Sequence, residues 1–324
     1  MKLSSYTTVY NCIDNKYPWK DSITSLLGFS DEVCIVDGGS TDGTWEELLN
    51  WSKNESRLKI DQHKIDWTRP DFAYESDGRQ KTRARKLCTG SVCWQSDVDE
   101  IVVEKDYQKV RNLSVLLQES DLDLIALPII EYWGSKGKVR IDINPWKWRI
   151  SKNKDYIIHG IPNTLLRKRE DGSEYALSGT DSCDYINVNS KEIIPFGFVF
   201  DIEKVNQIRL HALSGKKEYI DIYQNVIEEV IDKIPTVRHY SWYNIENKIH
   251  NYKKHWSKFW CSLYNKPLED TIENNMMFDK AWKHVSDEDI KMLSEKLEEK
   301  LGGWIFHEKI NWNKNIPWIQ KNWE

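Results

Sequence analysis

Short apolar runs and apolar residues at helical spacing alternate along the amino-terminal part of the chain. Continuous runs of about four to eight apolar residues are typical of buried strands, whereas apolar residues three or four positions apart are typical of helices. The runs at Tyr6–Cys12 and Glu32–Val36 predict strands, and the spacing within Asp21–Leu27 predicts a helix between them. A strand, a helix and a strand within about thirty residues indicate a right-handed parallel crossover unit.

The alternation continues further along the chain. Thr44–Glu47 has the spacing of a capping box and precedes an apolar face, which predicts a second helix. Asp66–Gly78 has no periodicity and contains Pro70, so it predicts a loop over a crevice. The other predicted elements are a strand at Arg57–Ile65, a helix at Arg79–Leu87, and strands at Ser91–Ser96 and Leu124–Ile130. This order of elements favours an α/β layer architecture.

Acidic residues follow two of the predicted strands. Asp37 opens a glycine-rich turn after one strand, and Asp97 and Asp99 follow another. Ligands of open α/β sheets gather outside the carboxyl ends of the strands, so both corners face one crevice. A nucleotide held beside these acids requires a metal ion, and Mg²⁺ or Mn²⁺ typically takes one or two carboxylates besides phosphates and water. The alternatives are an Asp-Gly turn chosen for its conformation and an acidic turn at the surface.

In their order and spacing, four segments resemble the family 2 glycosyltransferases of the GT-A fold. They are Thr8–Asn11, Val36–Thr44, the basic helix before Thr89-Gly90, and Asp97–Glu100. The resemblance is densest between Tyr6 and Glu100 and looser from there to His239. It implies a Rossmann-like mixed sheet flanked by helices. It also implies transfer of a sugar, with inversion, from a nucleoside diphosphate donor, a UDP-sugar, to a saccharide or another hydroxyl acceptor, with Mn²⁺ or Mg²⁺ as the cofactor.

The resemblance assigns roles to residues that match its motifs. Thr8, Tyr10 and Asp37 would hold the base and ribose, and Gly38 lets the backbone approach a ligand closely. Asp97 and Asp99 form the acidic pair that binds the metal and the donor. A basic residue of the helix helps to bind the diphosphate. That helix carries two stripes, and the sequence does not decide between them or exclude a solvated face: Lys81 with Arg85, and Arg79 with Arg83 and Lys86.

An inverting transfer needs a general base for the acceptor hydroxyl. Asp184 is preferred slightly over Asp181, since both lie in a polar loop where the family places its base. His159 is a further candidate, on the acceptor or phosphate side, and Gly160 follows it where some relatives carry a Glu. His239 matches a carboxy-terminal histidine that many GT-A enzymes use for the metal or the diphosphate. Packing roles remain the alternative for both histidines.

Composition narrows the class of partner. The 46 basic and 51 acidic residues give a net charge of −5, which argues against nucleic acid as a target. The six cysteines have no CxxC spacing, and Cys12, Cys34 and Cys93 lie in apolar runs, so we expect reduced core thiols. No signal peptide or transmembrane segment is recognisable, which predicts a cytoplasmic protein.

The chain is expected to divide into a nucleotide-sugar-binding catalytic domain, residues 1–240, and a helical extension, residues 241–324. Tryptophans are scattered through the charged, helix-favouring sequence of the second part: Trp256, Trp260, Trp282, Trp304, Trp312, Trp318 and Trp323. Packing of helices by these side chains is the expected role, and stacking on sugar rings is the alternative.

Three other functions were weighed. A nicotinamide-binding Rossmann enzyme is disfavoured because the turn after Asp37 lacks the order G-x-G-x-x-G. A sugar-nucleotide pyrophosphorylase requires a basic, glycine-rich amino-terminal loop, which Tyr6–Asn15 does not provide. A non-catalytic carbohydrate-binding or scaffold protein remains an alternative, and hydrolysis of a UDP-sugar would separate it from an enzyme.

Overall fold

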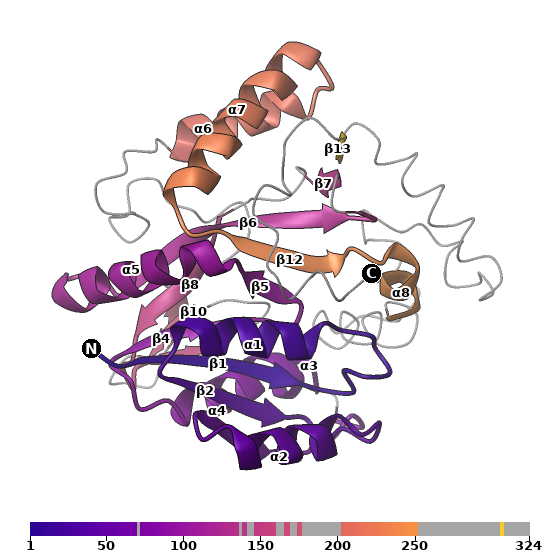
Figure 1. Ribbon diagram of the computed structural model, residues 1–324, viewed down its shortest axis with the longest axis vertical. Coiled ribbons are helices and arrows are strands. Elements are labelled where there is room, and N and C mark those ends of the chain that lie inside the picture. Colours follow the sequence, from indigo (N-terminus) through magenta and orange to yellow (C-terminus); the bar gives the residue numbers. More distant parts are fainter. Residues whose placement is uncertain are drawn as a thin grey trace.

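A mixed β-sheet with helices on both faces organises the chain (Figure 1). The computed structural model describes residues 1–69, 72–135, 138–140, 146–159, 165–168, 174–176, 202–251 and 305–307, and over these residues the sheet has ten strands. The order along its main path is β13-β7-β6-β8-β4-β1-β2-β3; β12 pairs with β6, and β5 pairs with β12. The predicted α/β layer architecture is confirmed.

The amino-terminal half of the sheet is parallel. It consists of β1 (Leu3–Val9), β2 (Glu32–Asp37), β3 (Leu58–Gln62) and β4 (Val92–Gln95). Strand β1 pairs in parallel with both β2 and β4, and β2 pairs in parallel with β3. The helices α1 (Trp19–Phe29) and α2 (Thr44–Asn54) connect consecutive strands, which confirms the predicted crossover units.

Two local predictions in this half need correction. The first strand ends at Val9 rather than Cys12, because Asn11 has a left-handed φ of 45° and turns the chain. The predicted capping box is wrong: α2 has Gly43 as its N-cap, and the Thr44 hydroxyl instead accepts the backbone N–H of Cys12 at 3.0 Å. Thr44 therefore fastens the loop after β1 to the start of α2.

The rest of the sheet comes from later parts of the chain. Strand β6 (Leu124–Trp133) is antiparallel to β8 (Trp146–Lys152), which is antiparallel to β4. Strand β12 (Val237–Trp242) lies between β6, to which it is parallel, and β5 (Glu100–Val102), to which it is antiparallel. Strands β7 (Lys138–Arg140) and β13 (Ile305–His307) extend the edge. A separate small sheet contains β9 (Ile157–His159), β10 (Leu165–Lys168) and β11 (Glu174–Ala176).

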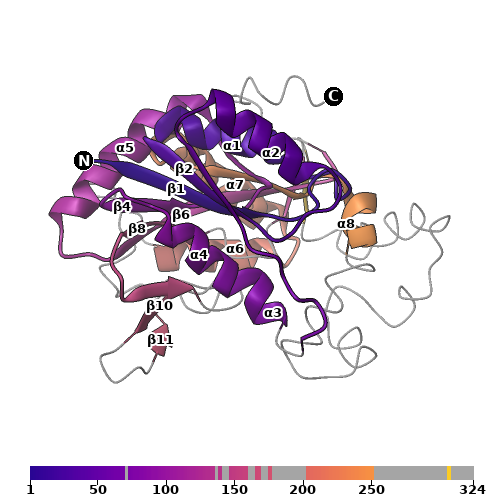
Figure 2. The same cartoon turned by 90° about the horizontal axis from the view of Figure 1, so that it is seen from below.

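Helices cover the two faces of the sheet differently (Figure 2). The apolar sides of α1, α2 and α5 (Tyr107–Glu119) share one core, to which Trp94 contributes. On the opposite face α4 (Gln80–Lys86) packs through Ala84 on Tyr6, Cys34 and Cys93. Helices α6 (Ile202–Ala212) and α7 (Lys217–Lys233) belong to a second core with residues of β6 and β12. A short 3₁₀ turn, Glu104–Asp106, precedes α5.

The predicted loop at Asp66–Gly78 is wrong in its second half. A short helix, α3 (Phe72–Tyr74), continues as a π-helical turn at Glu75–Arg79 and runs directly into α4. Ion pairs stabilise this segment, because Glu75 accepts from Arg79 and Arg83 on the same helical stretch and also pairs with His63. Such a segment shows no apolar periodicity in the sequence.

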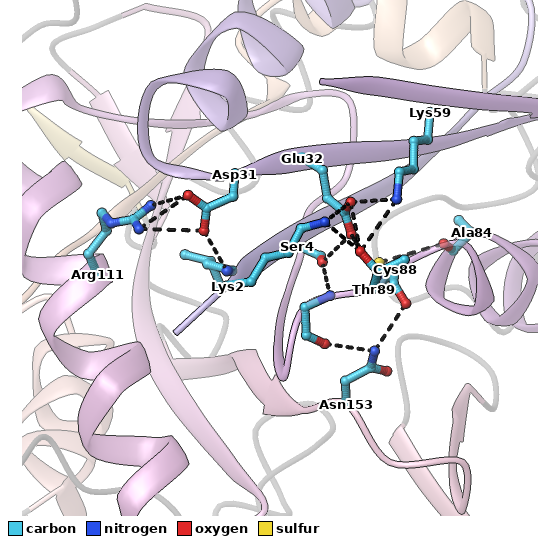
Figure 3. A network of polar contacts seen from close by, with 12 residues as sticks. Lys2, Ser4, Asp31, Glu32, Lys59, Ala84, Cys88, Thr89, Arg111 and Asn153 are labelled. Carbon is cyan, nitrogen blue, oxygen red and sulfur yellow. Dashed lines mark hydrogen bonds and ion pairs between the residues drawn. The ribbon is translucent and has the colours of Figure 1, made fainter. Parts of the chain in front are cut away.

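A network of polar contacts fastens the amino-terminal ends of the parallel strands (Figure 3). Glu32, at the start of β2, pairs with Lys2 at 2.7 Å and with Lys59 from β3. The same carboxylate accepts from the Ser4 hydroxyl and from the Thr89 backbone N–H, each at 2.6 Å. One buried carboxylate thus joins β1, β2, β3 and the turn before β4.

The described cysteines behave as expected. Cys12, Cys34, Cys88 and Cys93 are buried and free. Cys183 and Cys261 lie outside the described residues. The predicted helical extension is described only at α8 (Ile245–Asn251) and β13, so the tryptophans named for it lie outside the described residues too. Among the helices that the structure describes, none has both the length and the apolar character needed to cross a bilayer.

Candidate active site

The glycine turn after β2 is held by its own aspartate. Asp37 is fully buried, and its Oδ1 accepts the backbone N–H groups of Gly39 and Ser40 at 2.8 and 2.9 Å. Gln62 Nε2 donates to the same oxygen at 2.9 Å. Gly39 has a φ of 91°, which favours glycine. Asp37 therefore stabilises the turn, as one of the two sequence interpretations has it, and its binding of ribose or base stays a prediction.

Thr8 and Tyr10 lie beside this turn. The β1–β2 register places Thr8 opposite Val36 and Val9 opposite Asp37, and both Thr8 and Tyr10 are partly exposed. A Cβ atom on Gly38 would lie 2.6 Å from Ile65 Cδ1 and 3.3 Å from Tyr10 Cδ2, so a side chain there would displace the end of the Ile65 side chain. The structure thus brings Thr8, Tyr10, Asp37 and Gly38 together.

An aromatic cluster that the sequence did not indicate adjoins Tyr10. The ring of Tyr10 packs on Trp67 with centroids 4.8 Å apart, and Trp67 contacts Phe72 at 5.6 Å. Burial raises the pKa of Tyr10. Trp67 lies in the segment predicted as an irregular loop. Such a segment has no periodic spacing from which the role of one aromatic ring could be predicted.

The first acid of the pair contacts the basic helix. Asp97 Oδ1 lies 3.1 Å from Lys81 Nζ and accepts from Gln95 Nε2 at 3.1 Å. Lys81 also pairs with Asp77 at 2.7 Å, and its side chain is nearly fully buried. Of the two stripes on the helix, the one carrying Lys81 reaches the acidic corner, the name used below for the surroundings of Asp97 and Asp99. Arg79 and Arg83 of the other stripe pair with Glu75 instead.

A buried ion pair anchors the loop that carries Asp97. Glu100 Oε2 accepts the backbone N–H of Asp97 at 3.1 Å, and its Oε1 pairs with Arg149 Nη2. Arg149 also donates to Gln95 Oε1 at 3.1 Å. Glu100 and Arg149 are 1 % exposed. Both side chains therefore hold the Asp97 loop from the buried side.

The second acid faces the carboxy-terminal histidine. Asp99 Oδ1 lies 3.3 Å from His239 Nε2, and His239 Nδ1 lies 3.3 Å from Glu131 Oε2. The backbone N–H of Tyr240 donates to the Asp99 carbonyl at 2.8 Å. These contacts come from three strand ends, namely the turn into β5, β6 and β12.

Charges in this corner shift the ionisation of its members. Burial by itself raises the pKa of Asp97, but Lys81, Arg149 and His239 outweigh it and hold that pKa below its ordinary value. Burial likewise acts to raise the pKa of Asp99, and His239 outweighs it. For His239 burial acts to lower the pKa, whereas Asp99 and Glu131 raise it to about 10. Both acids are therefore carboxylates near neutral pH, and His239 is an imidazolium that neutralises them.

The corner suits a divalent cation that also binds phosphates. Among the described residues, no group of three or more His, Cys, Asp and Glu side chains is placed so that it could hold a metal ion by itself. Mg²⁺ and Mn²⁺ typically take one or two carboxylates and complete their shell with phosphate and water oxygens. Asp99 Oδ1 and His239 Nε2 face each other, and Glu131 on Nδ1 fixes the tautomer that leaves Nε2 as a ligand. These residues fit an incomplete metal site, with Mn²⁺ accepting imidazole more readily than Mg²⁺.

Two predicted site residues lie deeper in the molecule. Arg85 is buried and donates to Ser151 Oγ at 2.8 Å and to the Tyr6 hydroxyl at 3.3 Å. His159 Nε2 lies 2.6 Å from the same hydroxyl, and burial, with Lys81 and Arg85, lowers its pKa. Both side chains thus contact buried protein groups between α4 and the sheet. Their binding or catalytic roles stay predictions. Asp181 and Asp184 lie outside the described residues.

Glu131, Arg149 and Lys248 belong to the corner but were not predicted as site residues. Burial lowers the pKa of Lys248, whose charge in turn lowers the pKa of Asp99. Glu131 follows an uninterrupted apolar run, where a single buried acid is the available signal. Lys248 lies in the short helix α8 and has no distinguishing sequence context.

Comparisons with known proteins give matches among solved structures alone. No family model and no curated protein matches the chain. TarS 1-349 from S. aureus is 13% identical, with a TM-score of 0.35, 99% of this chain and 77% of that chain covered. Its complex with UDP-GlcNAc is 14% identical, with a TM-score of 0.35 and coverage of 94% and 89%.

A third match is the mannosyltransferase PcManGT from Pyrobaculum calidifontis in complex with GDP-Man and Mn²⁺. It is 17% identical, with a TM-score of 0.31, 39% of this chain and 35% of that chain covered. All three matches combine low sequence identity with a low TM-score. The chemistry of the site follows from its own residues.

Proposed function

We propose that this protein is a metal-dependent glycosyltransferase that moves a sugar from a nucleoside diphosphate donor to a hydroxyl acceptor. One observation carries the proposal. Asp99 and His239 face each other as a pair of possible metal ligands, and Glu131 orients the His239 ring. The ion pair of Asp97 with Lys81 lies next to them, at the carboxyl ends of the strands. A UDP-sugar donor, a saccharide acceptor and inversion follow from the resemblance of the motifs.

The residues of the acidic corner would have different roles in binding a diphosphate. Lys81 supplies a buried positive charge beside Asp97, where a phosphate would bind. Glu100 and Arg149 hold the Asp97 loop in place, and Glu131 keeps the His239 ring oriented. A divalent cation bound by Asp99, His239 and Asp97 would offset the negative charge that accumulates on the leaving diphosphate. Thr8, Tyr10, Asp37 and Gly38 would receive the nucleoside at the neighbouring strand ends.

We propose Asp184, ahead of Asp181, as the base that takes the proton of the acceptor hydroxyl. A carboxylate near the nucleophile is the usual base in such a transfer. The variants Asp184→Asn and Asp181→Asn separate the two, because the variant of the true base loses turnover while its affinity for UDP with Mn²⁺ is kept. Equal, full activity in both variants would refute the assignment.

The proposed function is tested by incubating the protein with a panel of nucleotide-sugars and Mn²⁺ and measuring release of free nucleoside diphosphate. We expect release with at least one UDP-sugar, and its complete loss in Asp97→Ala and in Asp99→Ala. Glu46→Ala, which removes an exposed carboxylate on α2, is the matched control. Thermal unfolding shows whether the variants fold. No release with any donor, or full release in either aspartate variant, would favour the non-catalytic carbohydrate-binding alternative.

A further inference from the structure

A cavity of about 210 Å³ lies beside the acidic corner. One wall is formed by residues 16–18 of the loop after β1, and the other by residues of the segment 240–251, which covers the end of β12 and α8. The space is large enough for several water molecules. It is smaller than the roughly 300–1,000 Å³ of a pocket for a drug-sized ligand, and it fits a group such as one sugar ring.

The cavity and the acidic corner share structural elements. Tyr240, in the cavity wall, follows His239 directly and donates its backbone N–H to Asp99 O. Ser241, also in the wall, accepts a hydrogen bond from Lys248 Nζ. On the opposite side Pro18 precedes α1, whose Ser22 hydroxyl donates to Asp97 O at 3.2 Å. A ligand in the cavity would therefore lie next to the proposed metal and donor site.

The lining is rich in amide groups with unused hydrogen-bonding capacity. Asn247 Nδ2 donates to the Asn15 carbonyl at 2.7 Å, and Asn251 Nδ2 donates to the same carbonyl at 3.4 Å. Asn244 Oδ1 accepts the backbone N–H of Asn247 at 2.9 Å. Among the residues that the structure describes, the opposite end of each of these three amides has no protein partner. The cavity thus offers two acceptors and one donor of fixed position.

The remaining lining defines the charge and the apolar surface. Tyr17, Tyr240 and Tyr243 contribute aromatic rings, and Lys16 is the one charged residue among the described residues that line the cavity. Aromatic faces provide apolar surface for the C–H groups of a sugar ring, while amides match its hydroxyls. Within the described part of the chain, no lining residue carries a carboxylate that would compete for those hydroxyls or attract a cation.

We infer that this cavity is the acceptor subsite and binds an uncharged, hydroxyl-rich ring of a saccharide acceptor, an inference that rests on the proposed function. Asn244, Asn247 and Asn251 recognise hydroxyl groups of that ring, and the tyrosines pack on its face. The position of the cavity next to Asp99 directs a neighbouring hydroxyl towards the donor. The acceptor is thereby distinguished from the nucleotide, which is expected on the other side of the corner, at Asp37.

The inference is tested by direct binding of methyl glycosides of glucose, galactose and N-acetylglucosamine to the full chain, measured by NMR titration with UDP and Mn²⁺ present. The test variants are Asn247→Leu, which removes an amide, and Asn244→Asp, which keeps a side chain that caps α8 but places a negative charge in the wall. Asn50→Asp on the exposed face of α2 repeats the same chemical change elsewhere and serves as the matched control.

We expect at least one glycoside to bind, with at least a tenfold loss of affinity in both cavity variants and none in Asn50→Asp. Binding of UDP with Mn²⁺ should stay within twofold, which shows that the variants are folded. Unchanged glycoside binding in the cavity variants, or binding of inorganic phosphate in place of every glycoside, would overturn the inference. Failure of the proposed function gives a different result: glycoside binding sensitive to both variants, without release of nucleoside diphosphate from any donor.

Discussion

At the scale of single residues, His239 connects the ionisation of the site to its proposed metal. Asp99 and Glu131 raise the pKa of His239 to about 10, so without a metal the ring carries a proton that neutralises both acids. A divalent cation bound at Nε2 replaces that proton. Metal binding and proton release are then one equilibrium, and the affinity for the metal increases with pH up to the pKa of the ring.

We therefore predict that binding of Mn²⁺ with UDP at pH 7.5 releases about one proton from the ring of His239. Isothermal titration calorimetry in Hepes and in Tris measures the release, because the two buffers differ in ionisation enthalpy. His239→Gln should bind more weakly and lose the dependence on buffer. The same dependence in wild type and variant would show that His239 does not give up a proton to the metal.

Arg149 and Glu100 illustrate a residue pair that the sequence could not place. Their side chains come from β8 and β5, are almost fully buried, and support the Asp97 loop. Breaking a buried ion pair by removing one partner costs about 3–5 kcal/mol, because the other charge stays buried without compensation. Removing both charges avoids that penalty.

We predict that Arg149→Met and Glu100→Gln each lower the free energy of unfolding by about 3 kcal/mol or more. The double variant should be clearly more stable than the sum of the two single effects implies. Urea denaturation of the four proteins measures this double-mutant cycle. Additive losses would mean that the two side chains do not stabilise the protein as a pair.

At the scale of elements, the sequence predicted several with a clear apolar period, left the amphipathic helices α5 and α7 unnamed, and missed the π-helical turn, which has no such period. The parallel strands and the helices α1, α2 and α4 follow from apolar runs and spacing, and the structure confirms them within a few residues. The π-helical turn Glu75–Arg79 is stabilised by ion pairs along the helix and contains a glycine. Neither the spacing of apolar residues nor helix propensity therefore predicts it. This turn leads into α4 with Lys81 directed at Asp97.

The choice between the basic stripes of α4 leads to a prediction about the donor. Lys81 lies between Asp77 and Asp97, so its removal leaves two uncompensated carboxylates where a diphosphate is expected. We predict that Lys81→Met weakens binding of UDP with Mn²⁺ at least tenfold, about 1.4 kcal/mol or more. Lys86→Met, on the exposed face of the same helix, should bind UDP as the wild type does. Equal affinities in the two variants would show that neither stripe contacts the diphosphate.

At the scale of the whole molecule, half of the sheet was predictable. Consecutive parallel strands joined by helices obey a handedness rule, so the neighbours β1, β2 and β3 follow from their sequence order, whereas the return of β4 to the other edge of β1 does not. The other half joins β6, β8, β5 and β12 from distant parts of the chain, and no local rule gives that pairing. His239 and Asp99 could be named from motifs, while Glu131 required the β6–β12 pairing to be known.

The stability of the whole sheet should depend on pH through Glu32. Burial by itself raises the pKa of this carboxyl, but Lys2, Lys59, Ser4 and Thr89 outweigh it and hold the pKa well below the ordinary value of 4.5.

A carboxyl whose pKa is lower in the folded state contributes stability above its unfolded pKa and loses that contribution as the pH falls towards the folded value. We therefore predict that Glu32→Gln is less stable than the wild type by about 1–3 kcal/mol at pH 7, since buried donors such as the Thr89 N–H lose a charged acceptor. The difference in the free energy of unfolding should narrow steadily below about pH 4.5, where the unfolded carboxyl takes up a proton.

Urea denaturation at pH 7 and at pH 3.5 measures the difference between wild type and Glu32→Gln at each pH. Glu229→Gln, which removes an exposed carboxylate paired with Lys233, is the control and should show little effect at either pH. A constant difference between wild type and Glu32→Gln at both pH values would mean that the carboxylate charge does not fasten the strands.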